Sequence, residues 1–216
     1  MPIIAVSHQK GGVGKSTLAY NIAVELSKKY HVEVVDLDVQ ETVSSYNRIR
    51  KLMGQEGLNV KIFTSDEDLL YYYNNVDEKT IVVVDSGGFD SALNRLSILA
   101  ADFLLTPVSS EFTELLGLEK YKQILEQISL QSGNKVITNV VLNKINPSQK
   151  HFNEIVDFIN ESPYFVKLNS ILRRRVDFAN SVAHGFSVNE LDATSESAKE
   201  FNELLQEIID KGITNG

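Results

Sequence analysis

Short apolar runs alternate along the chain with longer stretches in which apolar residues recur at helical spacing. Runs that are apolar at nearly every position are typical of parallel strands buried on both faces. Strands that alternate with amphipathic helices form βαβ units, so the pattern predicts an α/β fold: a central, mostly parallel, twisted sheet with helices on both faces. The strands are expected at 3–6, 32–35, 60–63, 81–84, 103–105 and 140–142, and the clearest helices at 18–26, 115–128, 152–159 and 201–208.

The composition fits one domain over residues 1–216, because no Pro-, Gly- or Ser-rich linker and no repeat divides the chain. The chain has no cysteine, which excludes disulfides, thiolate metal sites and a cysteine nucleophile. No apolar run approaches the roughly 18 residues of a transmembrane helix, and the first residues lack the pattern of a signal peptide. We therefore expect a cytoplasmic protein without a membrane partner. A net charge of −8 argues against a nucleic-acid partner unless basic residues gather in a patch.

Polar residues directly follow three of the predicted strands. They are Asp36, Asp85 and Asn143. Ligands of open α/β sheets bind in the crevice beyond the carboxyl ends of the strands. The three side chains are therefore expected to share one ligand-binding edge of the sheet.

A glycine-rich segment, Gln-Lys-Gly-Gly-Val-Gly-Lys-Ser-Thr (9–17), separates the first strand from the first helix. Glycines let backbone N–H groups approach an anion, and the N-terminus of the following helix favours negative charge at the same place. Lys15 is positioned to reach the β- and γ-phosphates of a nucleotide, and the Ser16 hydroxyl to hold Mg²⁺. The segment therefore predicts a P-loop NTPase that uses ATP and Mg²⁺. The alternative is a glycine-rich turn with surface lysines, since Gln9 replaces the glycine of the strict pattern and Lys10 adds a second cation.

Three motifs together resemble those of the deviant Walker family of ATPases. They are Lys-Gly-Gly-Val-Gly-Lys-Ser-Thr (10–17), Val-Val-Asp-Leu-Asp-Val-Gln (34–40) and Val-Val-Val-Asp-Ser (82–86). Within this family the chain resembles the small ParA-type partitioning ATPases, the group without an N-terminal DNA-binding domain. The similarity extends over essentially the whole chain. It implies a Mg²⁺-dependent ATPase that converts ATP to ADP and phosphate.

The resemblance also implies roles for individual residues. Lys10 is similar to the signature lysine that reaches across a dimer to the partner's nucleotide, and Asp38 to the carboxylate that positions or activates the attacking water. Thr17 matches the α-phosphate contact, and Asn143 resembles the residue that reads the adenine edge. The implied catalytic residues are Lys10, Lys15 and Asp38; the nucleotide-binding residues are Gly11, Gly12, Val13, Gly14, Lys15, Ser16, Thr17 and Asn143; the magnesium site is Ser16, Asp36, which acts through water, and the Walker B residue Asp85.

Two of these carboxylates also have a plainer interpretation, Asp36 as a helix N-cap and Asp38 as a turn residue. Phosphoryl transfer depends mainly on positioning and charge neutralisation, which two lysines, Mg²⁺ and an aspartate near the attacking water supply. The chain departs from the family after Asp85, where Gly87 and Gly88 stand in place of prolines. These glycines form either a mobile segment that senses the γ-phosphate or a plain loop.

Residues 167–175 hold the densest basic cluster, with four basic residues and no acidic one. In ParA-type proteins a basic face formed across the ATP-bound dimer holds DNA without sequence specificity, through contacts to phosphates. The resemblance therefore implies DNA binding by Arg173, Arg174 and Arg175. The alternative is a solvated turn whose charges pair with Glu190 or Asp192.

The leading hypothesis is an ATP-dependent DNA segregation protein associated with the nucleoid. The resemblance implies that ATP drives a sandwich homodimer, which binds DNA and a ParB-like centromere-binding protein that stimulates slow hydrolysis. One alternative is a MinD-like ATPase at a membrane, although the acid-leaning segment 204–212 differs from a basic amphipathic helix. Another is a metabolic P-loop enzyme of the dethiobiotin-synthetase type. A positioned cargo other than DNA also fits.

Overall fold

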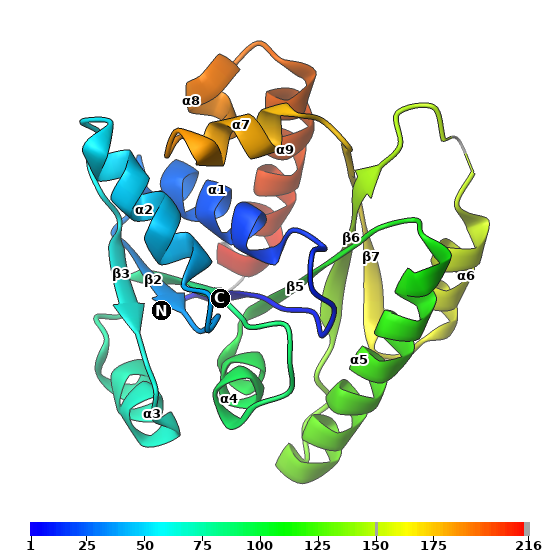
Figure 1. The fold of residues 1–216 in the computed structure, drawn as a ribbon. Coiled ribbons are helices and arrows are strands. Elements are labelled where there is room, and N and C mark those ends of the chain that lie inside the picture. The colour runs from blue at the N-terminus through cyan, green and yellow to red at the C-terminus, as the bar shows by residue number, and fades with distance from the viewer. Residues whose placement is uncertain (150, 214–216) are drawn as a thin grey trace.

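The computed structural model describes residues 1–149 and 151–213, and its centre is a seven-stranded sheet (Figure 1). Every strand pairing is parallel, in the order β3-β2-β4-β1-β5-β6-β7. The prediction of a mostly parallel sheet is thereby confirmed. The strands are β1 (Ile3–Val6), β2 (Val32–Asp36), β3 (Asn59–Ile62), β4 (Ile81–Asp85), β5 (Phe103–Val108), β6 (Thr138–Ile145) and β7 (Phe165–Arg173).

Helices cover both faces of the sheet, as the alternating pattern predicted. In Figure 1 one face carries α1, α2, α7, α8 and α9, and the other carries α3, α4, α5 and α6. The helices are α1 (Lys15–Ser27), α2 (Thr42–Leu52), α3 (Asp66–Asn75), α4 (Ala92–Ala100), α5 (Phe112–Ser132), α6 (Asn153–Glu161), α7 (Asp177–Ala183), α8 (Val188–Asp192) and α9 (Glu196–Ile208), and a short π-helix, η1 (Ile209–Ile213), follows α9.

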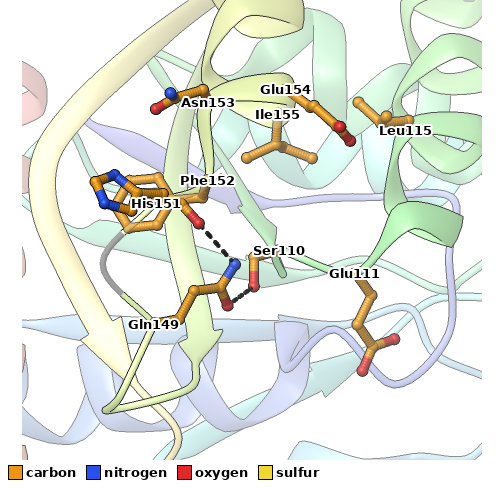
Figure 2. Close-up of a pocket in the computed structure, with 9 residues that line it drawn as sticks. All are labelled: Ser110, Glu111, Leu115, Gln149, His151, Phe152, Asn153, Glu154 and Ile155. Carbon is orange, nitrogen blue, oxygen red and sulfur yellow. Dashed lines mark hydrogen bonds between the residues drawn. The ribbon is translucent and has the colours of Figure 1, made fainter.

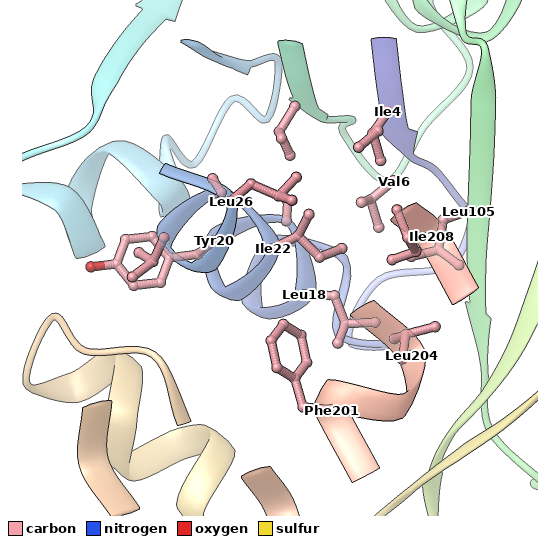
Figure 3. Close-up of a cluster of buried hydrophobic side chains, with 14 of the residues drawn as sticks. Ile4, Val6, Leu18, Tyr20, Ile22, Leu26, Leu105, Phe201, Leu204 and Ile208 are labelled. Atoms are coloured by element: carbon pink, nitrogen blue, oxygen red, sulfur yellow. The ribbon is translucent and has the colours of Figure 1, made fainter. Parts of the chain in front are cut away.

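The apolar side of α1 forms the centre of the core on its face of the sheet. Leu18 and Ile22 of α1 are buried against the α9 residues Phe201, Leu204 and Ile208 (Figure 3). Burial of each of these side chains contributes roughly 1.5–3 kcal/mol to the stability of the fold. The apolar side of α9 is therefore part of the core, which fixes α1 and the loop that precedes it.

Strand β7 was not predicted from the sequence. Its residues alternate between buried positions, such as Phe165, Leu168 and Leu172, and more exposed ones, such as Val166 and Asn169. It lies at the edge of the sheet, so polar residues interrupt the continuous apolar run by which buried parallel strands are recognised. The prediction of a solvated turn within 167–175 is wrong for residues 167–173, which are strand.

The register of the central strands brings their carboxyl ends together. Val6 at the end of β1 pairs with Asp85, and Asp36 at the end of β2 pairs with the same residue. Strand β1 lies between β4 and β5. The segments that follow β1, β2 and β4 consequently leave the sheet side by side, which places the predicted phosphate loop beside both aspartates.

Candidate nucleotide-binding site

The glycine-rich loop runs from β1 to α1 in the middle of the sheet. Gly12 and Gly14 have φ angles of +78° and +100°, in the left-handed region that favours glycine. A Cβ atom at Gly14 would lie 2.6 Å from Asn143 Nδ2, and this nitrogen donates a hydrogen bond to Val13 O at 2.7 Å. The loop conformation therefore requires glycine at position 14 and is braced by β6.

The N-terminus of α1 opens directly into this loop. Gly14 is the N-cap residue, no side chain caps the helix, and the first turn has no acidic residue. The first N–H groups of a helix have no acceptor within the helix, and the helix dipole adds partial positive charge there. An uncapped N-terminus beside a glycine-rich turn is suited to bind phosphate groups.

Lys15 places a cation inside the loop. Its ammonium donates to Lys10 O at 3.0 Å, and the residue is only 5% exposed. Burial lowers the pKa of Lys15, whereas the charges of Asp85, Asp38 and Glu114 raise it. A buried ammonium is costly unless it is paired, and a nucleotide phosphate would pair it.

Asp85 ends β4 and is fully buried. Within the described part of the chain, neither of its carboxylate oxygens has a hydrogen-bond partner. Burial raises the pKa of Asp85 from 3.8 to about 8, although the nearby Ser16 hydroxyl and Lys15 ammonium act in the opposite direction. A carboxylate without a partner beside a hydroxyl fits Mg²⁺, which takes one or two carboxylates together with phosphate oxygens. Among the described residues no group of three or more His, Cys, Asp or Glu side chains could hold a metal ion by itself.

The other two predicted carboxylates follow from β2. Asp36 is buried and accepts hydrogen bonds from Ser44 N at 2.9 Å, Ser44 Oγ at 2.8 Å and Asp38 N at 3.3 Å. Asp36 therefore fixes the first turn of α2. Asp38 is half-buried, and its Oδ1 accepts from Gln40 N at 2.9 Å, as in an Asx turn. Asp38 thus has the predicted turn role, whereas Asp36 is not the N-cap of α2, because Glu41 takes that position. The catalytic and metal roles of the two residues stay predictions.

The segment that follows β4 is tied to α4. Buried Asn94 accepts from Gly87 N at 3.2 Å and donates to Phe89 O at 2.6 Å. Gly88, between these two contacts, borders the phosphate loop, because a Cβ atom there would lie 3.5 Å from Lys15 Nζ. Gly88 therefore lies beside the lysine of the phosphate loop, whereas Gly87 borders Leu37 O and Asn94. The role of this segment in sensing a phosphate stays a prediction.

A pocket of about 520 Å³ adjoins the loop on the side of β6 and β7, a volume in the usual range for a small-molecule site. Lys144, which the sequence pattern did not single out, has a φ of +56° and donates from Nζ to Gly12 O at 2.7 Å. The pocket is lined by Gly14, Thr17, Leu18, Asn143, Lys144, Arg173, Arg174, Arg175, Val176, Phe178 and Ala179. It therefore continues from the loop towards the predicted position of the nucleoside.

The three arginines of the basic cluster differ in their surroundings. Arg173 donates to Gln149 O at 3.0 Å, and Arg175 donates to Glu200 Oε1 at 2.7 Å. Arg174 is exposed. Two of the arginines thus have contacts within the protomer, which leaves Arg174 as the most accessible of the three.

The acids expected to pair with this cluster are engaged elsewhere. Glu190 binds the Arg50 guanidinium through two hydrogen bonds of 2.7 and 2.9 Å, and Asp192 accepts from Thr194 Oγ1 at 2.7 Å. The ion pair of the cluster is instead made with α9, through Glu200. The predicted pairing with Glu190 or Asp192 is therefore wrong.

A partly buried polar cluster joins the first residues of the loop to α5. Lys10 Nζ lies 3.0 Å from Thr113 Oγ1 and 3.2 Å from Glu114 Oε2. His8 Nε2 lies 3.3 Å from Glu114 Oε1, and burial lowers the pKa of His8 to about 3, so the imidazole is neutral. No local pattern could have identified Glu114, because it lies 104 residues from Lys10 along the chain.

A separate pocket lies at the start of α5 (Figure 2). Gln149 spans it: its Oε1 accepts from Ser110 Oγ at 2.5 Å, and its Nε2 donates to His151 O at 3.0 Å. The lining residues are Ser110, Glu111, Leu115, Gln149, His151, Phe152, Asn153, Glu154 and Ile155. They belong to the start of α5, to α6 and to the segment before α6, so this pocket is distinct from the phosphate loop.

A glycine-rich loop after a central parallel strand, a buried lysine at its end and an unpartnered aspartate on the neighbouring strand together define a P-loop nucleotide-binding protein. Residues 4–188 match the CobQ/CobB/MinD/ParA nucleotide-binding domain family. The chain therefore belongs to this family of ParA/MinD-type ATPases.

Similar proteins differ in the processes for which they are named. Maintenance of carboxysome distribution protein A of Halothiobacillus neapolitanus is 28% identical over 213 aligned positions, covering 95% of this chain and 95% of the relative. The virulence plasmid ParA family protein pGP5-D of Chlamydia psittaci is 25% identical over 253 aligned positions, covering 98% of this chain and 95% of the relative.

Solved structures share the fold at low sequence identity. A plasmid partition protein of Borrelia burgdorferi bound to AMPPNP has a TM-score of 0.69 at 18% identity and covers 97% of this chain and 99% of its own. A Cyanothece McdA complex with ATP has a TM-score of 0.75 at 16% identity, over 97% and 96% of the two chains. MinD of Aquifex aeolicus has a TM-score of 0.70 at 19% identity, over 99% of each chain. Among the described residues, no helix is both long and apolar enough to cross a membrane.

Proposed function

We propose that this protein is an ATP-dependent partition ATPase of the ParA type, which segregates DNA through an ATP-driven homodimer. ATP would occupy the glycine-rich loop and the adjoining pocket. A virulence plasmid protein of the ParA family and a protein named for maintenance of carboxysome distribution are among the relatives, which supports a positioning role. The main alternative within the same mechanism is a cargo other than DNA, such as a carboxysome.

The roles within one protomer follow from charge and position. Lys15 neutralises the β- and γ-phosphates, while the N–H groups of the loop and of α1 bind the phosphate oxygens. Ser16 and Asp85 would hold Mg²⁺, which adds charge neutralisation when bound. Asp38, half-buried after β2, orients the attacking water. Asn143 donates to Val13 O through Nδ2, and its Oδ1 would accept from the adenine edge.

The observation that carries the proposal is the direction of Lys10. Its main-chain oxygen contacts Lys15, but its ammonium lies on α5, beside Thr113 and Glu114. A second loop lysine whose charge lies outside its own phosphate cradle is suited to meet a triphosphate bound by another protomer. The groove around it is lined by Gln9, Lys10, Gly88, Phe89, Thr113, Leu116, Gly117 and Lys120.

The test of the dimer is sedimentation velocity of the protein with ATP, with ADP and without nucleotide. Asp38→Ala would slow hydrolysis and trap the ATP form. The wild type is expected to form a dimer with ATP only. The dimer should accumulate in Asp38→Ala and should be absent in Lys10→Ala. A mass that is the same in all three conditions would refute the ATP-driven dimer.

DNA binding is proposed to require the exposed Arg174, supported by Arg173 and Arg175. Phosphate contacts of this kind are independent of sequence and weaken as salt rises. Arg174→Ala is expected to lower DNA affinity in ATP at low salt, whereas Arg48→Ala, which removes an exposed arginine of α2, leaves it unchanged. Equal affinity of wild type and the triple alanine variant of 173–175 would exclude this patch as the DNA site.

A MinD-like role at a membrane is disfavoured by the packing of α9. Its apolar residues Phe201, Leu204 and Ile208 are buried in the core, so they are not available to enter a lipid surface. Sedimentation with anionic liposomes in the presence of ATP separates the two functions. ATP-dependent recovery of the protein with the liposomes would favour the membrane role.

A further inference from the structure

Glu114 is a buried acid at the point where α5 meets the glycine-rich loop. Its side chain is 1% exposed, and its Oε2 accepts from Ser109 Oγ at 2.8 Å as well as from Lys10 Nζ at 3.2 Å. His8 Nε2 lies 3.3 Å from the other oxygen, but the two atoms do not form a hydrogen bond of regular geometry. Since the His8 imidazole is neutral, Lys10 is the cation in contact with this carboxylate among the described residues.

Close packing holds the two groups in this arrangement. Gly117, one turn after Glu114, faces the loop: a Cβ atom there would lie 3.1 Å from His8 Cε1 and 3.5 Å from Lys10 Cβ. The His8 ring stacks on Tyr121, with ring centres 5.6 Å apart. The backbone of Lys10 is fixed from the same side, because Lys10 N donates to His8 Nδ1 at 2.8 Å. Because the backbone is held, departure of the Lys10 ammonium from Glu114 requires rotation of the Lys10 side chain.

We propose that Glu114 is a positioning residue that holds Lys10 against α5 and competes with the partner protomer's triphosphate for its ammonium. This inference rests on the proposed ATP-driven dimer. Departure of Lys10 leaves a buried carboxylate without its cation, which opposes dimer formation. Glu114 thereby sets how much ATP-bound protein is needed before two protomers associate.

The contact itself is tested on the protein without nucleotide, by the rate at which an amine-reactive N-hydroxysuccinimide ester labels Lys10. Mass spectrometry of the digested protein resolves Lys10 from the other lysines. Glu114→Gln is expected to speed labelling about tenfold, the factor expected for the loss of one hydrogen bond between charged groups. Glu111→Gln is the matched control, because Glu111 is an exposed acid that precedes the same helix. Equal labelling rates in Glu114→Gln and wild type would overturn the proposal.

The competition is tested by the dimer dissociation constant in ATP, measured by sedimentation in the Asp38→Ala background. Glu114→Gln is expected to lower this constant about tenfold, equivalent to about 1.4 kcal/mol. An unchanged or higher constant in a variant that melts at the wild-type temperature would refute the competition. If Glu114→Gln lowers the melting temperature without changing the labelling rate, its role is structural and the proposal fails.

The two measurements also separate this inference from the proposed function. A wild-type protein that stays monomeric in ATP would overturn the ATP-driven dimer and the competition with it. The labelling rate would still decide, in the same protein, whether Glu114 restrains Lys10.

Discussion

Replacement of Asp85 by asparagine is predicted to make the protein more stable near neutral pH. The carboxyl group is fully buried, neither oxygen has a hydrogen-bond partner within the described chain, and burial raises its pKa from 3.8 to about 8. An amide has nearly the same shape and carries no charge. The substitution therefore removes an ionisation that folding opposes, at the cost of the predicted magnesium ligand.

The size of the effect follows from proton linkage. The folded protein keeps a proton that the unfolded chain releases, so the stability contributed by Asp85 is fully present below about pH 3.8 and is lost as the pH rises to about 8. Within this window the free energy of unfolding of the wild type falls by about 1.36 kcal/mol per pH unit relative to Asp85→Asn. The relative loss between pH 5 and pH 7 is therefore about 2.7 kcal/mol as an upper estimate.

The assay is urea unfolding of both proteins at pH 5, 6 and 7, without Mg²⁺ and nucleotide. The free energy of unfolding of Asp85→Asn should rise relative to that of the wild type with each increase in pH. Addition of Mg²⁺ and ATP should make the wild type the more stable protein, because only the wild type keeps the predicted magnesium ligand. Asp157→Asn, which neutralises an exposed carboxylate of α6, should follow the wild type at every pH. If the free energies of unfolding of wild type and Asp85→Asn change in parallel with pH, burial does not oppose the ionisation of Asp85 and the reasoning is refuted.

Two further predictions concern the phosphate loop and the ion pair between α2 and α8. Gly14→Ala is expected to lower the free energy of unfolding by about 1–3 kcal/mol, because the residue has a positive φ and its Cβ would lie 2.6 Å from Asn143 Nδ2; thermal unfolding and titration with a fluorescent ATP analogue should show reduced stability and affinity together. Arg50→Ala is expected to cost about 1–3 kcal/mol, because Glu190 loses its ion pair and keeps, among the described residues, only the hydrogen bond from Ser187 N. Loss of the exposed Arg48 should cost less than about 0.5 kcal/mol. Similar urea midpoints for the two arginine variants would contradict the second prediction.

The sequence by itself determined the sheet centre and the loop. Strands buried on both faces must be apolar at nearly every position, and a phosphate cradle must be rich in glycine, so both are written in short contiguous segments. The strand ends at Asp36 and Asp85 were predictable for the same reason, and the register of β2 and β4 places them opposite each other. The edge strand β7 was not predictable from the sequence, because a half-exposed strand needs fewer apolar residues than a strand buried on both faces.

Tertiary structure alone decided how the loop is supported and how α2 is joined to α8. Asn143 braces Val13 across 130 residues, Glu114 holds Lys10 across 104, and Arg50 joins α2 to α8 through Glu190 across 140. Asn143 could be singled out as a strand-end residue, but the partner of each of these three side chains cannot be read from its own segment. Their partners are fixed by strand order and helix packing, which depend on the whole core, whereas the apolar pattern of a strand and the glycines of a turn depend on a few neighbouring residues.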